Sequence, residues 1–140
     1  MKSNSFRWSV SILGILLLAS WSLTAQRPRQ AFPAVASAQV PLYPPVARLA
    51  NVEGAVHLNV ATDGHRVVSV QVESGNKLLA APAEENVRTW QFSVHEPTTF
   101  KVTYSYRLVR DLDPVQNNPR ITLRLPTSVE VDALRAPSTE

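Results

Sequence analysis

Two runs of alternating apolar and polar residues lie in the first half of the chain. Residues 55–60 and residues 67–72 each place an apolar side chain at every second position. This period of two predicts two β-strands that each bury one face. The Asp63-Gly64 pair between the runs is typical of the turn of a β-hairpin.

The two apolar rows indicate the length of the hairpin loop. A loop of three residues, from Thr62 to Gly64, keeps both rows on one face, whereas a loop of two residues would place them on opposite faces. The longer loop also puts Gly64 at the left-handed position of a type I turn with a bulge. The pairs expected from this loop are Leu58 with Val68 and Val56 with Val70.

A short helix is predicted before the hairpin. Pro44 and Pro45 favour a helix start, because a residue there needs no main-chain N–H donor. Val46 and Leu49 lie three residues apart and are expected on the buried side of this helix.

A longer helix is predicted after the hairpin. Its apolar residues recur at helical spacing and are Leu79, Ala83, Val87 and Trp90. Pro82 is tolerated only in a first turn, so we expect the regular helix to begin close to Ala80. Phe92 follows the helix and is expected to close over the core.

The second half of the chain returns to alternation. The longest alternating run, residues 98–109, predicts the strongest strand of the chain. Two shorter runs, residues 121–125 and residues 129–131, are split by Pro126. The element order predicts an α+β fold, in which a three-stranded antiparallel sheet packs one face against two helices and a C-terminal extension adds short strands.

The chain begins with a segment typical of an export signal. Residues 1–25 combine the basic Lys2 and Arg7 with an apolar run and a small residue, Ala25, at the expected cleavage point. The alternative is a retained anchor, although the run is shorter than the roughly 20 residues of a membrane span. We expect residues 26–41 to be a linker, 42–110 the folded domain and 111–140 the extension.

Charge and composition exclude several functions. The 140 residues carry a net charge of +3, and removal of Lys2 and Arg7 leaves 12 basic against 11 acidic residues. No basic run or patch remains, so a nucleic-acid partner is not expected. The chain has no cysteine, which rules out thiol catalysis, disulfides and thiolate metal sites.

The sequence offers no convincing catalytic or metal-binding set. His57, His65 and His95 lie at positions too far apart in the expected hairpin to share a metal, so we interpret them as surface residues. Asp111 and Asp113 lack the further oxygen ligands of a calcium loop, and they are interpreted as part of a turn. We therefore expect neither an enzyme nor a cofactor.

The segment from Tyr43 to Leu108 resembles the C-terminal domain of TonB, the periplasmic energy transducer. The matching pieces are YPPVA, EGAVHLNV, DG, VVSVQVESG and VRTWQF, in the order and spacing of that family. The residues that carry the resemblance are Tyr43, Pro44, Pro45, Gly54, Asp63, Gly64, Gly75, Trp90 and Phe92. For these residues the resemblance implies structural roles.

The resemblance implies a periplasmic module that binds a segment of an outer-membrane, TonB-dependent receptor. Such a segment joins a sheet edge through main-chain hydrogen bonds, which requires no catalytic residues. Two departures argue against coupling to a proton-driven motor. Residues 26–41 are short beside the Pro-rich spacer of full transducers, and the leader has no histidine. Inner-membrane association would then require a retained leader.

The family pattern places the added peptide near the last common strand, residues 98–109. The residues expected at this edge are Thr99, Lys101, Thr103, Ser105 and Arg107. Residues 121–125 could fold back as an antiparallel neighbour and cover it. The alternative function is a structural or assembly domain of the cell envelope that uses the same edge, with a second copy or another envelope protein as partner.

We predict that export removes residues 1–25, so that the mature protein starts at Gln26. Mass spectrometry of the periplasmic fraction would show this N-terminus. An intact Met1 in the membrane fraction would instead support the anchored form.

Overall fold

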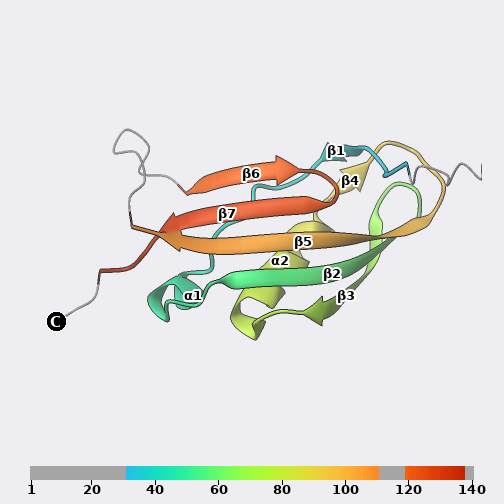
Figure 1. The fold of residues 1–140 in the computed structure, drawn as a ribbon. Coiled ribbons are helices and arrows are strands. Elements are labelled where there is room, and N and C mark those ends of the chain that lie inside the picture. Colours follow the sequence, from blue (N-terminus) through green and yellow to red (C-terminus); the bar gives the residue numbers. More distant parts are fainter. Residues whose placement is uncertain (1–30, 111–118, 138–140) are drawn as a thin grey trace, which may run out of the picture. The chain divides into compact units, whose positions relative to one another are not determined.

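The computed structural model describes residues 31–110 and 119–137, all within a compact unit that spans Ala31–Glu140. Their order of helices and strands confirms an α+β fold (Figure 1). The elements are β1 (Val35–Ser37), α1 (Pro45–Leu49), β2 (Gly54–Thr62), β3 (Val67–Ser74), α2 (Lys77–Arg88), β4 (Gln91–Phe92), β5 (Thr98–Val109), β6 (Arg120–Arg124) and β7 (Ser128–Leu134).

The main sheet is larger than the sequence analysis predicted. It has five strands in the order β3-β2-β5-β7-β6, and a separate two-stranded sheet pairs β1 with β4. All neighbours in the main sheet are antiparallel except β5 and β7, which are parallel. The prediction of a three-stranded antiparallel sheet was therefore wrong, although β3, β2 and β5 form an antiparallel part of this mixed sheet.

The C-terminal strands extend the sheet in an unexpected order. We expected residues 121–125 beside β5 as an antiparallel neighbour, but β7 takes that place and runs parallel to β5. The inward row of β7, Val129 and Val131, is fully buried, whereas Leu123 of β6 is exposed. The more apolar strand thus occupies the more buried position, and β6 pairs outside it.

The hairpin has a different register from the expected one. Leu58 lies opposite Val72 and Val60 opposite Val70, a shift of four residues from the predicted pairs. The Asp63 carboxylate accepts hydrogen bonds from the main-chain N–H groups of His65 and Arg66, which lengthens the turn and lowers the pKa of Asp63. A bulge after Ala61 restores the shared face of the two rows.

Gly64 adopts the left-handed conformation that the sequence predicted, with φ of +100°. A Cβ atom at this position would lie 2.3 Å from the main-chain oxygen of His95. Both conformation and space therefore favour glycine here.

The longer helix begins earlier than expected. The Asn76 side chain accepts a hydrogen bond from the N–H of Leu78 and caps α2 at Lys77. Pro82 therefore lies inside the helix, and the expected start near Ala80 was wrong. The predicted buried stripe is confirmed, because Leu79, Ala83, Val87 and Trp90 are almost fully buried.

The short helix is confirmed, but its buried side is not the expected one. Ala47 is fully buried, whereas Val46 and Leu49 are 63% and 73% exposed. The helix has five residues, and Val52 N–H donates to the Ala47 carbonyl directly after it. The small Ala47 side chain therefore faces the core, and the two larger side chains point outward.

The segment expected to be a linker contributes to the fold. Residues 26–41 include β1, which pairs with β4 beside the main sheet (Figure 1). Ser93 N–H also donates to the Ala34 carbonyl, and Val35 and Ala38 pack against the core. The expected leader, residues 1–25, lies outside the described residues.

An aromatic cluster fills the core between α2 and β5. Trp90, Phe92, Tyr104 and Tyr106 are buried, and the rings of Tyr104 and Tyr106 stack with centroids 6.2 Å apart. Burial raises the pKa of both tyrosines. Tyr104 donates its hydroxyl to Asn86 Oδ1 at 2.8 Å, whereas the Tyr106 hydroxyl has no partner among the described residues.

We predict opposite effects for two conservative substitutions in this cluster. Tyr106→Phe removes an unsatisfied buried hydroxyl and should raise the free energy of unfolding by about 1 kcal/mol. Tyr104→Phe removes the shorter of two hydrogen bonds to Asn86 Oδ1, leaving only Trp90 Nε1 at 3.4 Å, and should lower that free energy by about 1 kcal/mol. Urea denaturation of both variants measures the difference, and a loss of stability in Tyr106→Phe would contradict the unsatisfied hydroxyl.

Candidate functional site

The main-chain hydrogen bonds of β5 show which groups face each neighbour. Thr103 N–H donates to the Thr127 carbonyl at 2.9 Å, on the β7 side. Leu108 N–H donates to Glu53 Oε2 at 2.8 Å, on the β2 side. Successive residues of a strand alternate between its two edges. Odd-numbered residues of β5 therefore direct their main-chain groups toward β7, and even-numbered ones toward β2.

Most of the predicted receiving edge is already occupied. Thr103, Ser105 and Arg107 lie in the stretch of β5 that pairs with β7. Thr99 and Lys101 lie before that stretch, and among the described residues no strand pairs with them on the β7 side. The expected edge is therefore reduced to a short projection of β5, residues 98–102.

The outer edge of β3 is the longest open edge among the described strands. In the register with β2, Ser69 and Gln71 direct their main-chain groups inward, and Val70 and Val72 direct theirs outward. Val72 and Val68, which lie in the same row of β3 on either side of Val70, are 41% and 57% exposed. This edge offers main-chain donors and acceptors beside exposed apolar side chains.

The outer edge of β6 is shorter and charged. Its register with β7 directs the main-chain groups of Ile121 and Leu123 outward. Arg120 and Arg124 stand at the two ends of the strand and are exposed. A partner strand here would meet a guanidinium at each end.

The open face of the main sheet carries paired charges. Lys101 Nζ lies 3.0 Å from Glu73 Oε2. Arg107 binds the Asp132 carboxylate through two hydrogen bonds of 2.9 and 3.1 Å, which raise the pKa of Arg107. Because Asp132 is nearly buried and its carboxylate is bound by Arg107, this pair connects β5 to β7 on the face opposite the helices.

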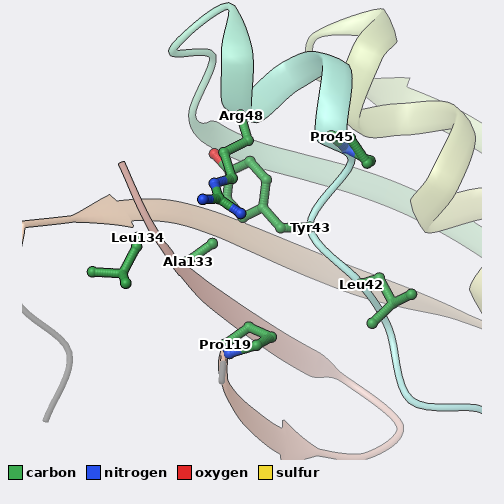
Figure 2. Close-up of a pocket in the computed structure, with 7 residues that line it drawn as sticks. All are labelled: Leu42, Tyr43, Pro45, Arg48, Pro119, Ala133 and Leu134. Carbon is green, nitrogen blue, oxygen red and sulfur yellow. The ribbon is translucent and has the colours of Figure 1, made fainter. Parts of the chain in front are cut away.

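A cavity of about 380 Å³ lies where β7 ends near α1 (Figure 2). Its lining residues are Leu42, Tyr43, Pro45, Arg48, Pro119, Ala133 and Leu134. Arg48 is the positively charged residue that lines the cavity, and it forms no ion pair with any described carboxylate. The cavity could hold an apolar side chain that is followed by a carboxylate.

Tyr43 forms a rigid wall of this cavity. Its hydroxyl donates to the Val52 carbonyl at 2.6 Å, and its ring meets that of Tyr106 edge to face. Burial, with a smaller contribution from the Glu53 carboxylate, raises the pKa of Tyr43 to about 12. The tyrosine is therefore neutral near pH 7 and acts as a structural anchor.

The other residues of the predicted motif also have structural positions. Pro44 precedes α1 and Pro45 opens it, and Trp90 and Phe92 are buried. Gly75 has φ of +133°, and a Cβ atom there would lie 2.9 Å from a Val56 methyl. Gly54 likewise has a positive φ, of +146°.

The three histidines do not converge on a common site. His57 contacts Thr103 on the open face of the sheet, whereas His65 and His95 bind main-chain carbonyls near β4. Within residues 31–110 and 119–137, no group of three metal-binding side chains comes together. Asp111 and Asp113 lie outside the described residues.

Comparisons with known proteins do not assign a family. No protein-family model matches the chain, and no curated protein matches it. Among the described residues, no helix has the length and apolar character needed to cross a membrane.

We predict that amide hydrogen exchange alternates along the strand edges. The amides of Val70, Val72, Ile121 and Leu123 face outward and should exchange quickly, because no strand bonds to them. The amides of Gln71 and Thr122 face inward and should be protected. Exchange followed by NMR tests each position, and strong protection at Val70 would show that the β3 edge is covered.

Proposed function

We propose that this chain is a periplasmic peptide-binding module, which binds a segment of an outer-membrane transport receptor by strand addition at the outer edge of β3. The ligand adds a sixth strand beside Val70 and Val72. Binding relies on main-chain hydrogen bonds and on burial of the exposed Val68 and Val72. The proposal involves no catalysis and no cofactor.

The observation that carries this proposal is the lack of protection at β3. Free edges are commonly protected by short length, by proline or by charged side chains. The β6 edge has five residues and an arginine at each end, whereas β3 has eight residues and one charge, Glu73. That charge is paired with Lys101 on the open face. An exposed apolar edge of this kind is suited to a partner strand.

The nature of the partner rests on the sequence resemblance. The TonB-like pieces include the whole of β3, VVSVQVES, and the Trp90 and Phe92 core. The export signal predicted for residues 1–25 would direct the module to the periplasm, where receptor segments are accessible. Energy coupling is not part of the proposal, for the two sequence departures described above.

The alternative function is assembly through the same edge. The polarity of β3 is symmetric about Val70, with Ser69 and Gln71 on either side and Val68 and Val72 beyond them. Two copies could therefore pair antiparallel about Val70 and bring valine against valine without opposing like charges. This symmetry favours a homodimer as the competing occupant of the edge.

We predict that Val70→Pro weakens strand addition and preserves the fold. Proline removes the outward N–H of an edge strand, a place where proline is tolerated. Synthetic peptides from the plug segments of TonB-dependent receptors should bind the natural protein and should bind Val70→Pro roughly tenfold more weakly. Isothermal titration gives the affinities, and thermal denaturation checks the fold.

Two control variants separate the contributions. Val70→Ala keeps the N–H and should bind within about threefold of the natural protein, because only side-chain area is lost. Thr99→Pro acts on the projection of β5, so a loss of binding there would move the site away from β3. No binding of any plug peptide, together with a Val70-dependent dimer in analytical ultracentrifugation, would support the assembly function instead.

A further inference from the structure

The two sides of β6 differ in chemistry along its outer edge. Ile121 and Leu123 lie opposite Val131 and Val129, on the face that packs toward the helices. Arg120, Thr122 and Arg124 lie on the open face, where Arg120 is opposite Asp132. A strand added outside β6 would therefore meet apolar side chains on one face and cationic ones on the other.

The inner edge of β6 already has a partner with the complementary pattern. In β7, valines alternate with Glu130 and Asp132, and these two acids lie opposite Thr122 and Arg120. A ligand on the outer edge meets the same β6 side chains in the same alternation, with Ile121 and Leu123 supplying the main-chain bonds. The alternation of acids and valines in β7 therefore indicates the sequence pattern expected of a ligand on the outer edge of β6.

The two arginines of β6 are not paired with any described acidic side chain. Arg107 on β5 binds both acids of β7, with Asp132 Oδ1 at 2.9 Å and Glu130 Oε2 at 3.8 Å. Neither Arg120 nor Arg124 forms an ion pair with a described carboxylate. The open face of this edge is therefore cationic.

The β6 strands of two copies do not fit each other in the register that is symmetric about Thr122. Two β6 strands that meet antiparallel about Thr122 would place Arg120 of one copy opposite Arg124 of the other. Like charges directly opposite each other destabilise a strand pair. Charge complementarity instead favours a strand that carries acids at these positions.

We propose that the outer edge of β6 is a second binding site, selective for an extended protein segment of the pattern acidic–apolar–any–apolar–acidic. The segment runs antiparallel to β6, with its first acid opposite Arg124 and its last acid opposite Arg120. Its two apolar residues pair with Leu123 and Ile121 through the main chain. This site is separate from the β3 edge and requires no ligand there.

The probe is a capped synthetic peptide with the core Glu-Val-Thr-Val-Asp, titrated into ¹⁵N-labelled mature protein. Amide shifts should change at Ile121 and Leu123 and remain unchanged at Val70 and Val72. A peptide with the core Lys-Val-Thr-Val-Lys should bind about tenfold more weakly at low salt, because two exposed ion pairs are lost. The preference should shrink at high salt.

Paired variants test charge and main chain separately. The double variant Arg120→Glu and Arg124→Glu should reverse the preference between the two peptides. Leu123→Pro removes the outward N–H and should weaken binding about tenfold, whereas Leu123→Ala keeps that N–H and should retain most of the affinity.

Three results would overturn the second site. They are equal binding of the acidic and basic peptides, absence of binding at millimolar peptide, and shifts confined to β3. In the last two cases the arginines serve only to protect the edge. Since the receptor-peptide experiments respond to Val70→Pro, failure at β6 leaves the proposed function at β3 intact.

Discussion

The structure depends on the buried row of β5, because this strand is paired on both edges and packed on one face. Phe100, Val102, Tyr104, Tyr106 and Leu108 are all nearly or fully buried beneath the helix layer. Strand β2 pairs along all of β5 except its last three residues, and β7 pairs along its second part. Among the strands that the structure describes, the open edges of the sheet therefore lie on β3, on β6 and on the start of β5, and the candidate binding sites follow from that arrangement.

The sequence predicted the parts of the fold that local chemistry determines. The strand runs, the α2 stripe and the Gly64 conformation follow from periodicity and steric limits, and all three are confirmed. Strand order was not predictable in the same way. Residues 121–125 and residues 129–131 both alternate, so the pattern does not show which of the two segments pairs with β5. The greater burial of Val129 and Val131 decides between them, and burial is a property of the assembled core.

The candidate site could be predicted only in part. The principle of strand addition came from the resemblance, but the edge assigned to it, on β5, is largely paired with β7. The exposed valines of β3 resembled core residues in the sequence, because alternation shows that a strand has one apolar face and does not show how much of it is covered. The inward row of β2, Val56, Leu58 and Val60, is fully buried, whereas Val68 and Val72 of β3 are exposed.

The parallel pairing of β5 with β7 has a consequence for how the chain folds. Strands β2, β3 and β5 join through short connections and a helix, whereas β6 lies between β5 and β7 in the chain. Contacts between distant parts of a chain form slowly, because the entropic cost of closing the loop comes before the contacts stabilise the chain. Until β7 docks, the second part of β5 is bare and resembles the receiving edge that the sequence suggested.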